Sequence, residues 1–419
     1  MNYLIETIGC QMNVCDSDIL NSVLLSYGGT KVNTLSDADV VIINTCAVRA
    51  QAEQKAFSFL GRVDEFKKEK KRGLKIVVVG CMAERLGDKI KRRFHGIDLI
   101  IGAKDIGNAA VRILDLCGMD KNVKSEIHGE KSDIVRYVTI MCGCDNYCSY
   151  CIVPSVRGKE ISFDYKNIIN ECRVMAGNGA KEIILLGQNV NSYRCGDVNF
   201  ASLIKKVSEI DEIQRIRFMT NHPKDLSSEL IETMEAHSKV CPHIHLPMQS
   251  ASNKVLYDME RKYTYEHYLG LVSMLRNKIP DINITTDIIV GFPGETEEDF
   301  LTTLKAIQQI RFGGLYVFRY SPRPNTKAAA MRDDVPLEEK KRRHAIILEE
   351  SNKISVEIVS KYVGTAQEVL TEKHENGILQ ARTRSARKVF IKGGEKDLGR
   401  NMNVLIKEAK INSLFGDII

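Results

Sequence analysis

The sequence lacks any apolar run long enough to cross a membrane, since no stretch approaches the roughly 18 uninterrupted apolar residues that a spanning helix needs. The opening residues Met1-Asn2-Tyr3 belong to neither a basic nor an apolar segment, so no signal peptide is expected. Without a secretory signal, the 12 cysteines are not expected to form a disulfide framework. We therefore expect a cytoplasmic protein, with no membrane partner, whose thiols bind metal. Its 419 residues suffice for two or three domains.

The densest cysteine segment lacks a fourth ligand. Cys144, Cys148 and Cys151 are spaced C-x-x-x-C-x-x-C, with no downstream partner at ligand spacing. Structural zinc sites and ferredoxin clusters have four protein ligands, whereas three thiolates can hold three irons of a 4Fe-4S cube and leave the fourth iron open. The pattern favours a cluster with a reactive iron; a zinc site or a chance spacing is the alternative.

Residues 1–125 alternate short apolar runs with amphipathic stretches, which predicts a doubly wound parallel sheet covered by helices on both faces. The expected strands are 3–8, 40–43, 76–79 and 99–101, and the expected helices are 17–27, 49–66, 83–94 and 106–116.

Three further cysteines stand just past the ends of these expected strands. Cys10 follows the first strand, Cys46 the second and Cys81 the third. Because the carboxyl ends of parallel strands share one edge of the sheet, the three thiols can converge. The alternative is three ordinary buried cysteines.

Residues 130–355 repeat the strand-then-helix pattern six times and predict a partial (β/α)6 barrel. The cysteine loop follows the first strand, and polar or glycine-rich segments follow most of the others, so the sequence predicts one site at that end of the barrel. The expected strands are 137–141, 183–186, 216–219, 243–246, 284–290 and 315–320.

Residues 358–419 predict a small antiparallel β-barrel of short strands separated by glycines, with strands expected at 368–370, 379–382, 388–391 and 403–406. Basic residues gather there, which suits a phosphate backbone, and Phe390 is the main candidate for base stacking. A solvated basic face is the alternative. The basic residues are Arg382, Arg384, Arg387, Lys388, Lys392, Lys396 and Arg400.

Read together, these motifs resemble the radical S-adenosylmethionine (radical SAM) methylthiotransferase family along essentially the whole chain. Residues 9–13, 44–46 and 80–84 are similar to the auxiliary-cluster motifs of that family, and residues 144–158 to its catalytic loop. Further similar segments are 245–250, 287–296 and 320–324, and the last domain resembles a TRAM domain. Residues 11–13 resemble the MiaB branch, which adds a methylthio group to C2 of N6-isopentenyladenosine beside a tRNA anticodon. Departures occur at Ala251 and Asn325, where a glycine is usual, and at Cys142, where an acidic or other polar residue is common.

The resemblance implies two 4Fe-4S clusters, one held by Cys144, Cys148 and Cys151 and an auxiliary one held by Cys10, Cys46 and Cys81. It also implies SAM as a cofactor and tRNA as the substrate, together with a reductant such as flavodoxin or ferredoxin, a sulfur donor and a monomeric chain. The residues expected to contact SAM are Gln188, Asn189, Thr220, His245, Gln249, Asp287 and Gly291. His245 can equally be a satisfied histidine at a strand end, and Arg157 a surface ion pair.

Three alternatives remain open at the sequence level. The acceptor can be threonylcarbamoyl-adenosine in tRNA or a ribosomal protein, and the chain can also be a non-catalytic iron-sulfur protein that binds RNA.

Overall fold

The computed structural model describes residues 1–48, 50–119 and 133–419, which form two compact units. Of the described residues, the N-terminal unit contains 1–48, 50–119, 142–145 and 151–161, and the barrel unit contains 133–141, 146–150 and 162–419. The predicted domain boundary at 125–130 and Arg49, where a helix was expected to begin, lie outside the described residues.

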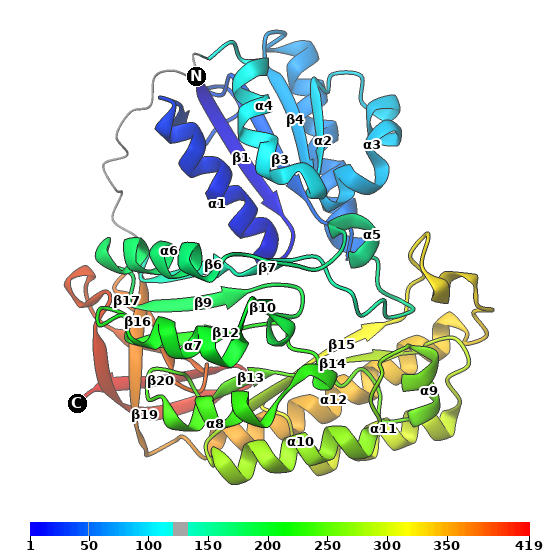
Figure 1. Cartoon of the computed structure of the whole chain (residues 1–419), viewed down its shortest axis with the longest axis vertical. Coiled ribbons are helices and arrows are strands. Elements are labelled where there is room, and N and C mark those ends of the chain that lie inside the picture. Colours follow the sequence, from blue (N-terminus) through cyan, green and yellow to red (C-terminus); the bar gives the residue numbers. More distant parts are fainter. Residues whose placement is uncertain (49, 120–132) are drawn as a thin grey trace. The chain divides into compact units, whose positions relative to one another are not determined.

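The N-terminal unit is built on a five-stranded sheet whose strands are all parallel (Figure 1). Its order is β2-β1-β3-β4-β5, with β1 at Asn2–Ile8, β2 at Thr30–Lys31, β3 at Val40–Thr45, β4 at Lys75–Gly80 and β5 at Leu99–Gly102. The predicted doubly wound sheet is confirmed, with one added two-residue edge strand, β2.

Helices cover both faces of this sheet. The side chains of β3 are completely buried and alternate: Val40 and Ile42 pack on one face, and Val41 and Ile43 pack on the other. The first face meets α1 and α4, and the second meets α2 and α3. The helices are α1 (Gln11–Ser26), α2 (Ala50–Glu69), α3 (Cys81–Arg93), the 3₁₀-helix η1 (Ala103–Asn108), α4 (Ala109–Leu116) and α5 (Val153–Arg157).

The barrel unit contains six parallel strands in two groups of three, close to their predicted positions. An isolated parallel bridge from Ile216 to Val240 links the groups, so the sheet curls as a partial barrel. The first group is β6 (Val135–Thr139), β9 (Glu182–Leu186) and β12 (Arg215–Phe218), and the second is β13 (His243–His245), β14 (Asn283–Val290) and β15 (Gly314–Arg319).

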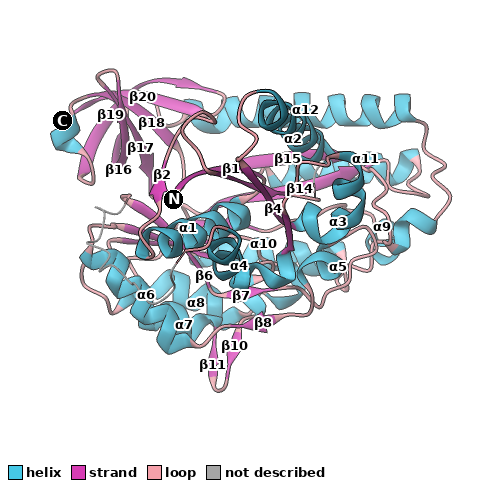
Figure 2. Ribbon diagram, turned by 90° about the horizontal axis from the view of Figure 1, so that it is seen from above, coloured by secondary structure: helices cyan, strands magenta, loops and turns pink. Residues whose placement is uncertain are grey.

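Helices alternate with these strands (Figure 2). They are α6 (Tyr165–Gly177), α7 (Phe200–Ser208), α8 (Ser228–Ala236), α9 (Asn253–Asp258), α10 (Tyr265–Lys278), α11 (Glu297–Ile310) and α12 (Leu337–Ser360). Short elements complete this part of the chain: β7 (Met141–Cys142), β8 (Ile161–Ser162), β10 (Arg194–Cys195), β11 (Val198–Asn199) and the 3₁₀-helices η2 (Val190–Ser192), η3 (Pro223–Asp225) and η4 (Lys327–Ala330).

The C-terminal strands form a closed small barrel within the same unit (Figure 1). Its order is β16-β17-β18-β20-β19, with β16 at Ala366–Glu375, β17 at Ile378–Thr383, β18 at Lys388–Lys392, β19 at Asn401–Lys410 and β20 at Ser413–Ile418; η5 spans Glu395–Asp397. The predicted small barrel is confirmed, but β20 is an added strand and its pairing with β18 is parallel.

None of the helices in the described ranges combines the length and the apolar character that a membrane span requires.

Candidate functional site

Three cysteines of the N-terminal unit lie at the carboxyl ends of neighbouring parallel strands. Cys10 follows β1 and caps α1, Cys46 follows β3, and Cys81 follows β4 as the first residue of α3. Because β1, β3 and β4 are adjacent in the sheet, these loops share one edge. The position of Cys10 at the N-terminus of α1 favours a thiolate, which is the form that binds metal.

The ionisation of these thiols is coupled. A hydrogen bond with Cys46 lowers the pKa of the Cys10 thiol to about 6, while burial acts in the opposite direction. The same hydrogen bond, burial and the charge of Cys10 raise the pKa of Cys46, so one thiol holds the proton that the other releases. Burial raises the pKa of Cys81, and the guanidinium of Arg157 opposes this shift. The three sulfur atoms therefore interact electrostatically within one small region.

A buried amide pair joins two of the cysteine loops. Asn13 Nδ2 donates to Asn44 Oδ1 at 2.7 Å, and Asn44 Nδ2 donates back to the carbonyl of Asn13 at 2.8 Å. Asn13 Oδ1 also accepts from the backbone N–H of Cys10 at 3.3 Å. Asn13 thus positions the loops, which gives the 11–13 segment a structural role as well as a family resemblance.

Glycine is required immediately before two of these cysteines. A Cβ at Gly9 would lie 2.3 Å from Asn13 Oδ1, and a Cβ at Gly80 would lie 2.6 Å from the carbonyl of Thr45. Gly80 also has a φ of +97°, which L side chains rarely adopt.

Arg157 is a buried partner of Asp16 and not a surface residue. Its Nη2 lies 2.7 Å from Asp16 Oδ2 and its Nη1 lies 3.4 Å from Oδ1, so the pair is bidentate. Although burial works against the charged form, the negative groups Asp16 and Cys81 hold the pKa of Arg157 above its usual value. Removing one partner of such a buried pair costs about 3–5 kcal/mol, because the other charge is left uncompensated.

The cysteine loop divides between the two compact units: Cys144 and Cys151 belong to the N-terminal unit, and Cys148 belongs to the barrel unit. In the N-terminal unit the backbone N–H of Cys144 donates to the carbonyl of Gly158 at 3.3 Å. In the barrel unit Ser149 fixes the loop to the end of α9, because its N–H donates to Met259 O at 3.0 Å and its Oγ to Asp258 O at 2.7 Å.

The donor chemistry of the two cysteine sets fits iron-sulfur clusters. Among the residues that the structure describes, no three His, Cys, Asp or Glu side chains converge as one shared metal ion requires. In a 4Fe-4S cube each thiolate binds its own iron, so the ligands surround the cube and do not converge on one ion. Thiolates are also the soft donor type that such clusters use.

Buried polar atoms without partners occur where the barrel strands end, and others, such as Glu182 Oε2 and His243 Nδ1, occur where strands begin. The described residues leave unpaired Gln188 Oε1 and Asn189 Oδ1 after β9, Asn221 Oδ1 after β12 and Gln249 Oε1 after β13. Buried polar atoms normally have hydrogen-bond partners, so these orphans indicate the place of a polar ligand. Three of the four belong to residues that the sequence predicted for SAM: Gln188, Asn189 and Gln249.

Backbone strain marks the same strand ends. Thr220, Gln249 and Gly291 have φ values of +69°, +67° and +69°. The first two are not glycine, and such conformations cost about 1–3 kcal/mol and persist mainly at functional sites. Gly291 has no room for a side chain, since a Cβ there would lie 2.3 Å from Lys340 Cγ.

His245 and Asp287 contact each other on neighbouring strands. His245 Nε2 lies 3.4 Å from Asp287 Oδ2, and its Nδ1 lies 3.0 Å from Thr285 Oγ1. Both ring nitrogens of His245 therefore already have partners, which is the arrangement of a satisfied histidine.

His222 was missed as a site residue by the sequence reasoning. Its Nδ1 accepts from the N–H of Lys224 at 3.2 Å, and burial lowers its pKa to about 2, so the neutral ring carries its proton on Nε2. That Nε2 is buried without a partner in the described residues. His222 therefore offers a ligand one hydrogen-bond donor. The clue in the sequence was its place in the polar segment that follows the third expected barrel strand, 216–219.

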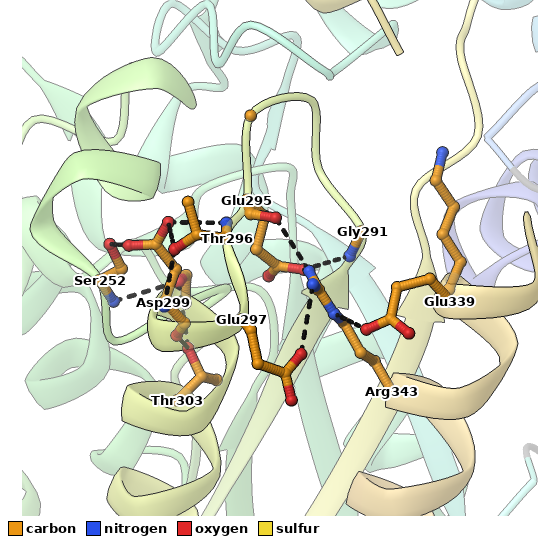
Figure 3. Close-up of polar contacts among 12 residues, drawn as sticks. Ser252, Gly291, Glu295, Thr296, Glu297, Asp299, Thr303, Glu339 and Arg343 are labelled. Carbon is orange, nitrogen blue, oxygen red and sulfur yellow. Dashed lines mark hydrogen bonds and ion pairs between the residues drawn. The ribbon is translucent and has the colours of Figure 1, made fainter. Parts of the chain in front are cut away.

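The loop between β14 and α11 is held by Arg343 of α12, as Figure 3 shows. Glu295 Oε2 accepts from the N–H of Gly291 at 2.6 Å and from Arg343 Nη1 at 2.7 Å. On the other side of the loop, Asp299 accepts from Ser252 Oγ at 2.6 Å. These bonds fix the two loops that carry Gly291 and Gln249.

The small barrel is fixed to the larger one by arginine-carbonyl bonds. Arg217 donates to the carbonyls of Thr383 at 2.8 Å and Arg384 at 2.7 Å, and Arg215 donates to that of Arg382 at 2.7 Å. In the opposite direction, Arg387 of the small barrel donates to the carbonyl of Gly313 in the larger barrel at 2.6 Å.

Contacts within the protein remove three of the basic residues from the RNA surface that the sequence predicted. Arg384 donates to the carbonyls of Ser238 and Val240, and Arg382 pairs with Glu372 at 2.6 Å, so with Arg387 three of the expected basic residues are engaged within the protein. Lys388, Lys392, Lys396 and Arg400 stay exposed.

An aromatic pair lies on the outer surface of the small barrel. The rings of Phe390 and Phe415 stack with centroids 5.5 Å apart, and the Lys410 ammonium lies 4.9 Å from the Phe415 centroid. Phe390 and Lys388 alternate with inward-facing core residues on β18, so both face outward.

Three known families match successive parts of the chain. Residues 2–102 match the family described as "Uncharacterized protein family UPF0004", residues 138–307 match the radical SAM superfamily, and residues 360–419 match the TRAM domain. Among solved structures, a radical S-adenosylmethionine methyltransferase, TsrM, from Kitasatospora setae is similar in fold, with a TM-score of 0.57 and 12% identity over 88% of this chain and 80% of that chain.

Curated relatives are similar over their full length. A protein of Endomicrobium trichonymphae named "tRNA-2-methylthio-N(6)-dimethylallyladenosine synthase" is 68% identical and covers 100% of both chains. A protein of the same name from Thermodesulfovibrio yellowstonii is 44% identical over 99% of this chain and 98% of the relative. The strand-end cysteines, the six-stranded partial barrel and the closed small barrel thus occur in a chain that belongs to the tRNA-2-methylthio-N(6)-dimethylallyladenosine synthase family of radical SAM methylthiotransferases.

Proposed function

We propose that this chain adds a methylthio group to C2 of N6-isopentenyladenosine next to the anticodon of tRNA. The observation that carries the proposal is the 68% identity, over the whole of both chains, to a relative named for that reaction. The three matched regions and the two cysteine sets support the same chemistry.

In this proposal the two sets of cysteines hold two 4Fe-4S clusters. Cys144, Cys148 and Cys151 hold the cluster that binds SAM, and Cys10, Cys46 and Cys81 hold the auxiliary cluster. When bound, these groups supply hydrogen abstraction from an unactivated carbon and delivery of sulfur, which no side-chain acid or base can perform. Asn13, Asn44 and the Arg157–Asp16 pair keep the auxiliary cysteine loops in place.

SAM contacts come from the strand ends of the barrel. We assign Gln188, Asn189 and Gln249 as direct polar contacts, since each carries a buried unpaired oxygen. Thr220 and Gly291 shape the loops through their positive φ values, and Asp287 with His245 forms a polar pair at the end of β13. His222 adds a neutral donor.

The RNA contact of the small barrel is the Phe390–Phe415 face with Lys388, Lys392 and Lys410. Stacking on an aromatic side chain stabilises an unpaired base by about 1–3 kcal/mol, and the lysines suit the phosphates. A reductant such as flavodoxin or ferredoxin and a sulfur donor are the remaining partners, and a cytoplasmic monomer fits a tRNA substrate.

The proposal is tested with full-length protein reconstituted anaerobically with iron and sulfide. It is incubated with SAM, a reductant and tRNA that contains isopentenyladenosine, and the nucleosides are measured by mass spectrometry. We expect the methylthio nucleoside to form, and Cys148→Ala or Cys81→Ala to abolish it. Cys172→Ala is the matched control and should retain activity, because Cys172 is a buried core residue of α6 outside both sets.

Protein that binds about eight irons and cleaves SAM but leaves this tRNA unmodified would contradict the proposal. Modification of a ribosomal protein, or of threonylcarbamoyl-adenosine, by the same preparation would then identify the acceptor.

A further inference from the structure

Arg261 is a buried arginine of the barrel unit that lies against a cysteine. It is 5% exposed, and its Nη1 lies 3.3 Å from Cys148 Sγ and 3.4 Å from the hydroxyl of Tyr150. Its Nη2 donates to the carbonyl of Pro247 at 3.1 Å, and its Nε lies 3.4 Å from the hydroxyl of Tyr263.

The side chain is rigidly placed. The N–H of Arg261 donates to Leu256 O at 3.0 Å, at the turn that ends α9. Its neighbours Glu260 and Lys262 both have positive φ values, +55° and +59°. Ser149, next to Cys148, is hydrogen-bonded to residues 258 and 259 of the same turn. Two adjoining segments therefore bring the guanidinium and the sulfur together.

The charge of Arg261 lacks a carboxylate counter-charge. Within the described part of the chain, no Asp or Glu forms a salt bridge with it, whereas the buried arginines Arg157, Arg217 and Arg343 each pair with an acid. Its other partners are one carbonyl and two phenol hydroxyls, and none of them is a carboxylate. A buried charge is costly unless it is paired, so Arg261 requires an anion.

We propose that Arg261 is the counter-charge of the iron-sulfur cluster held by Cys148, and that its permanent positive charge makes this cluster easier to reduce. The inference rests on the proposed function only in assigning Cys148 as a cluster ligand. Reduction adds one electron, supplied by a low-potential reductant, and hence one negative charge to the cluster. A cation that donates a hydrogen bond to a ligand sulfur stabilises that added charge. Arg261 is thus a positioning residue: it acts through Cys148 and changes the reduction potential of the cluster.

The test isolates this cluster in full-length protein that carries Cys10→Ala, Cys46→Ala and Cys81→Ala. In that background we compare Arg261 with Arg261→Met, which keeps bulk without charge, and with Arg261→Lys, which keeps the charge. Each protein is reconstituted anaerobically, its iron content and circular dichroism are measured, and the cluster is titrated by electron paramagnetic resonance. The control is Arg276→Met, which removes the guanidinium of an exposed arginine whose acceptors are the carbonyls of Ile310 and Arg311.

We expect Arg261→Met to shift the midpoint potential to a more negative value and Arg261→Lys to restore most of the shift, while Arg276→Met has no effect. Loss of iron in folded Arg261→Met, with retention in Arg261→Lys, also supports the counter-charge. An unchanged midpoint in iron-loaded Arg261→Met would overturn it, as would an equal shift in Arg276→Met or an equal loss of iron and fold in both Arg261 variants.

These results are separable from a failure of the proposed function. If the unsubstituted enzyme leaves tRNA unmodified but Arg261→Met shifts the midpoint, the reaction assignment fails and the role of Arg261 stands. If tRNA is modified and the midpoint does not move, the reverse holds.

Discussion

At the scale of single residues, the site depends on a few buried polar side chains that occupy defined places. Backbone conformation also limits which residue can occupy a position. Asn325 stands where the family usually has glycine, and its φ is +67°. Asparagine is among the few other residues that adopt this conformation readily. This departure from the family pattern therefore preserves the shape of the loop.

Asn13→Ala should disrupt the auxiliary site, because it removes the bond from Asn13 Nδ2 to the buried Asn44 Oδ1 and the bond that Asn13 Oδ1 accepts from the backbone N–H of Cys10. Each unsatisfied group costs about 1–3 kcal/mol. We expect the iron content to fall from about eight toward about four per chain. Iron analysis of reconstituted protein checks this, with Asn33→Ala, at an exposed position, as the matched control. An unchanged iron content would show that Asn13 is dispensable for the site.

His222 should make the protein less stable in mild acid. Burial lowers its pKa from 6.5 to about 2, so the unfolded chain takes up a proton below pH 6.5 that the folded chain refuses. Between pH 7.5 and 5.5 this reduces the free energy of unfolding by about 1.4 kcal/mol. His222→Asn should lose that part of the pH dependence, and His267→Asn, at an exposed position, should keep it. Denaturant unfolding at both pH values measures the difference; equal pH dependence in His222→Asn and the parent would refute the assignment.

At the scale of secondary-structure elements, α12 supports the loop after β14. It supplies Arg343, whose buried partner Glu295 has a side chain that is only 1% exposed. Arg342, one residue earlier, forms comparable ion pairs with Glu297 and Glu339 at the surface. The two arginines therefore provide an internal comparison of buried and exposed charge pairs.

Arg343→Met should destabilise the protein by about 3–5 kcal/mol and weaken SAM binding, because Glu295 is left as an uncompensated buried charge beside Gly291. Arg342→Met should cost no more than about 1 kcal/mol, since exposed pairs contribute little. Denaturant unfolding and equilibrium binding of SAM measure both effects. Equal losses in the two variants would mean that burial of the pair is not what holds the loop.

The sequence predicted the elements wherever hydrophobic periodicity decides them. All six barrel strands lie close to their expected positions, because short segments that contain β-branched, aromatic or other apolar residues alternate with helical stretches. Strand β20 was missed because Gly416 interrupts its pattern. In the structure that glycine allows close approach of β19, where a Cβ would lie 2.3 Å from the carbonyl of Leu405. Helix α1 begins at Gln11, earlier than expected, because Cys10 is an unusual helix cap.

The site residues also fall into two groups, those that a local sequence pattern predicts and those that it does not. The cysteine positions were predictable from spacing and from the ends of strands, and three of the proposed SAM contacts were predictable from their polar loops. The Arg157–Asp16 pair and the contact of Arg261 with Cys148 were not, because they join residues 141 and 113 positions apart. Such pairs follow from tertiary packing, which leaves no local pattern in the sequence.

At the scale of the whole molecule, the two faces of the small barrel have different tasks. Its 382–387 loop docks on the larger barrel through carbonyls and arginines, and the Phe390–Phe415 pair stays on the outside. Charge alone therefore does not identify the RNA surface of this domain.

The double variant Phe390→Ala, Phe415→Ala should weaken tRNA binding by about tenfold or more, because it removes stacking worth about 1–3 kcal/mol per base. Its unfolding temperature should change little, since both rings are partly exposed. Ile418→Ala, an exposed apolar residue on the same strand as Phe415, is the control. Filter binding of tRNA at fixed salt measures the effect; unaltered affinity would place the RNA contact elsewhere.

The docking bonds from Arg215 and Arg217 end on main-chain carbonyls of residues 382–384. Every amino acid presents such a carbonyl, so side chains of that loop can be exchanged without deleting an acceptor, whereas either arginine is irreplaceable as a donor. Substitutions across this junction should therefore be tolerated unequally. Those at Arg215 and Arg217 should be severe, whereas those in the small-barrel loop should be mild except at Arg384 and Arg387, whose own side chains donate to the larger barrel.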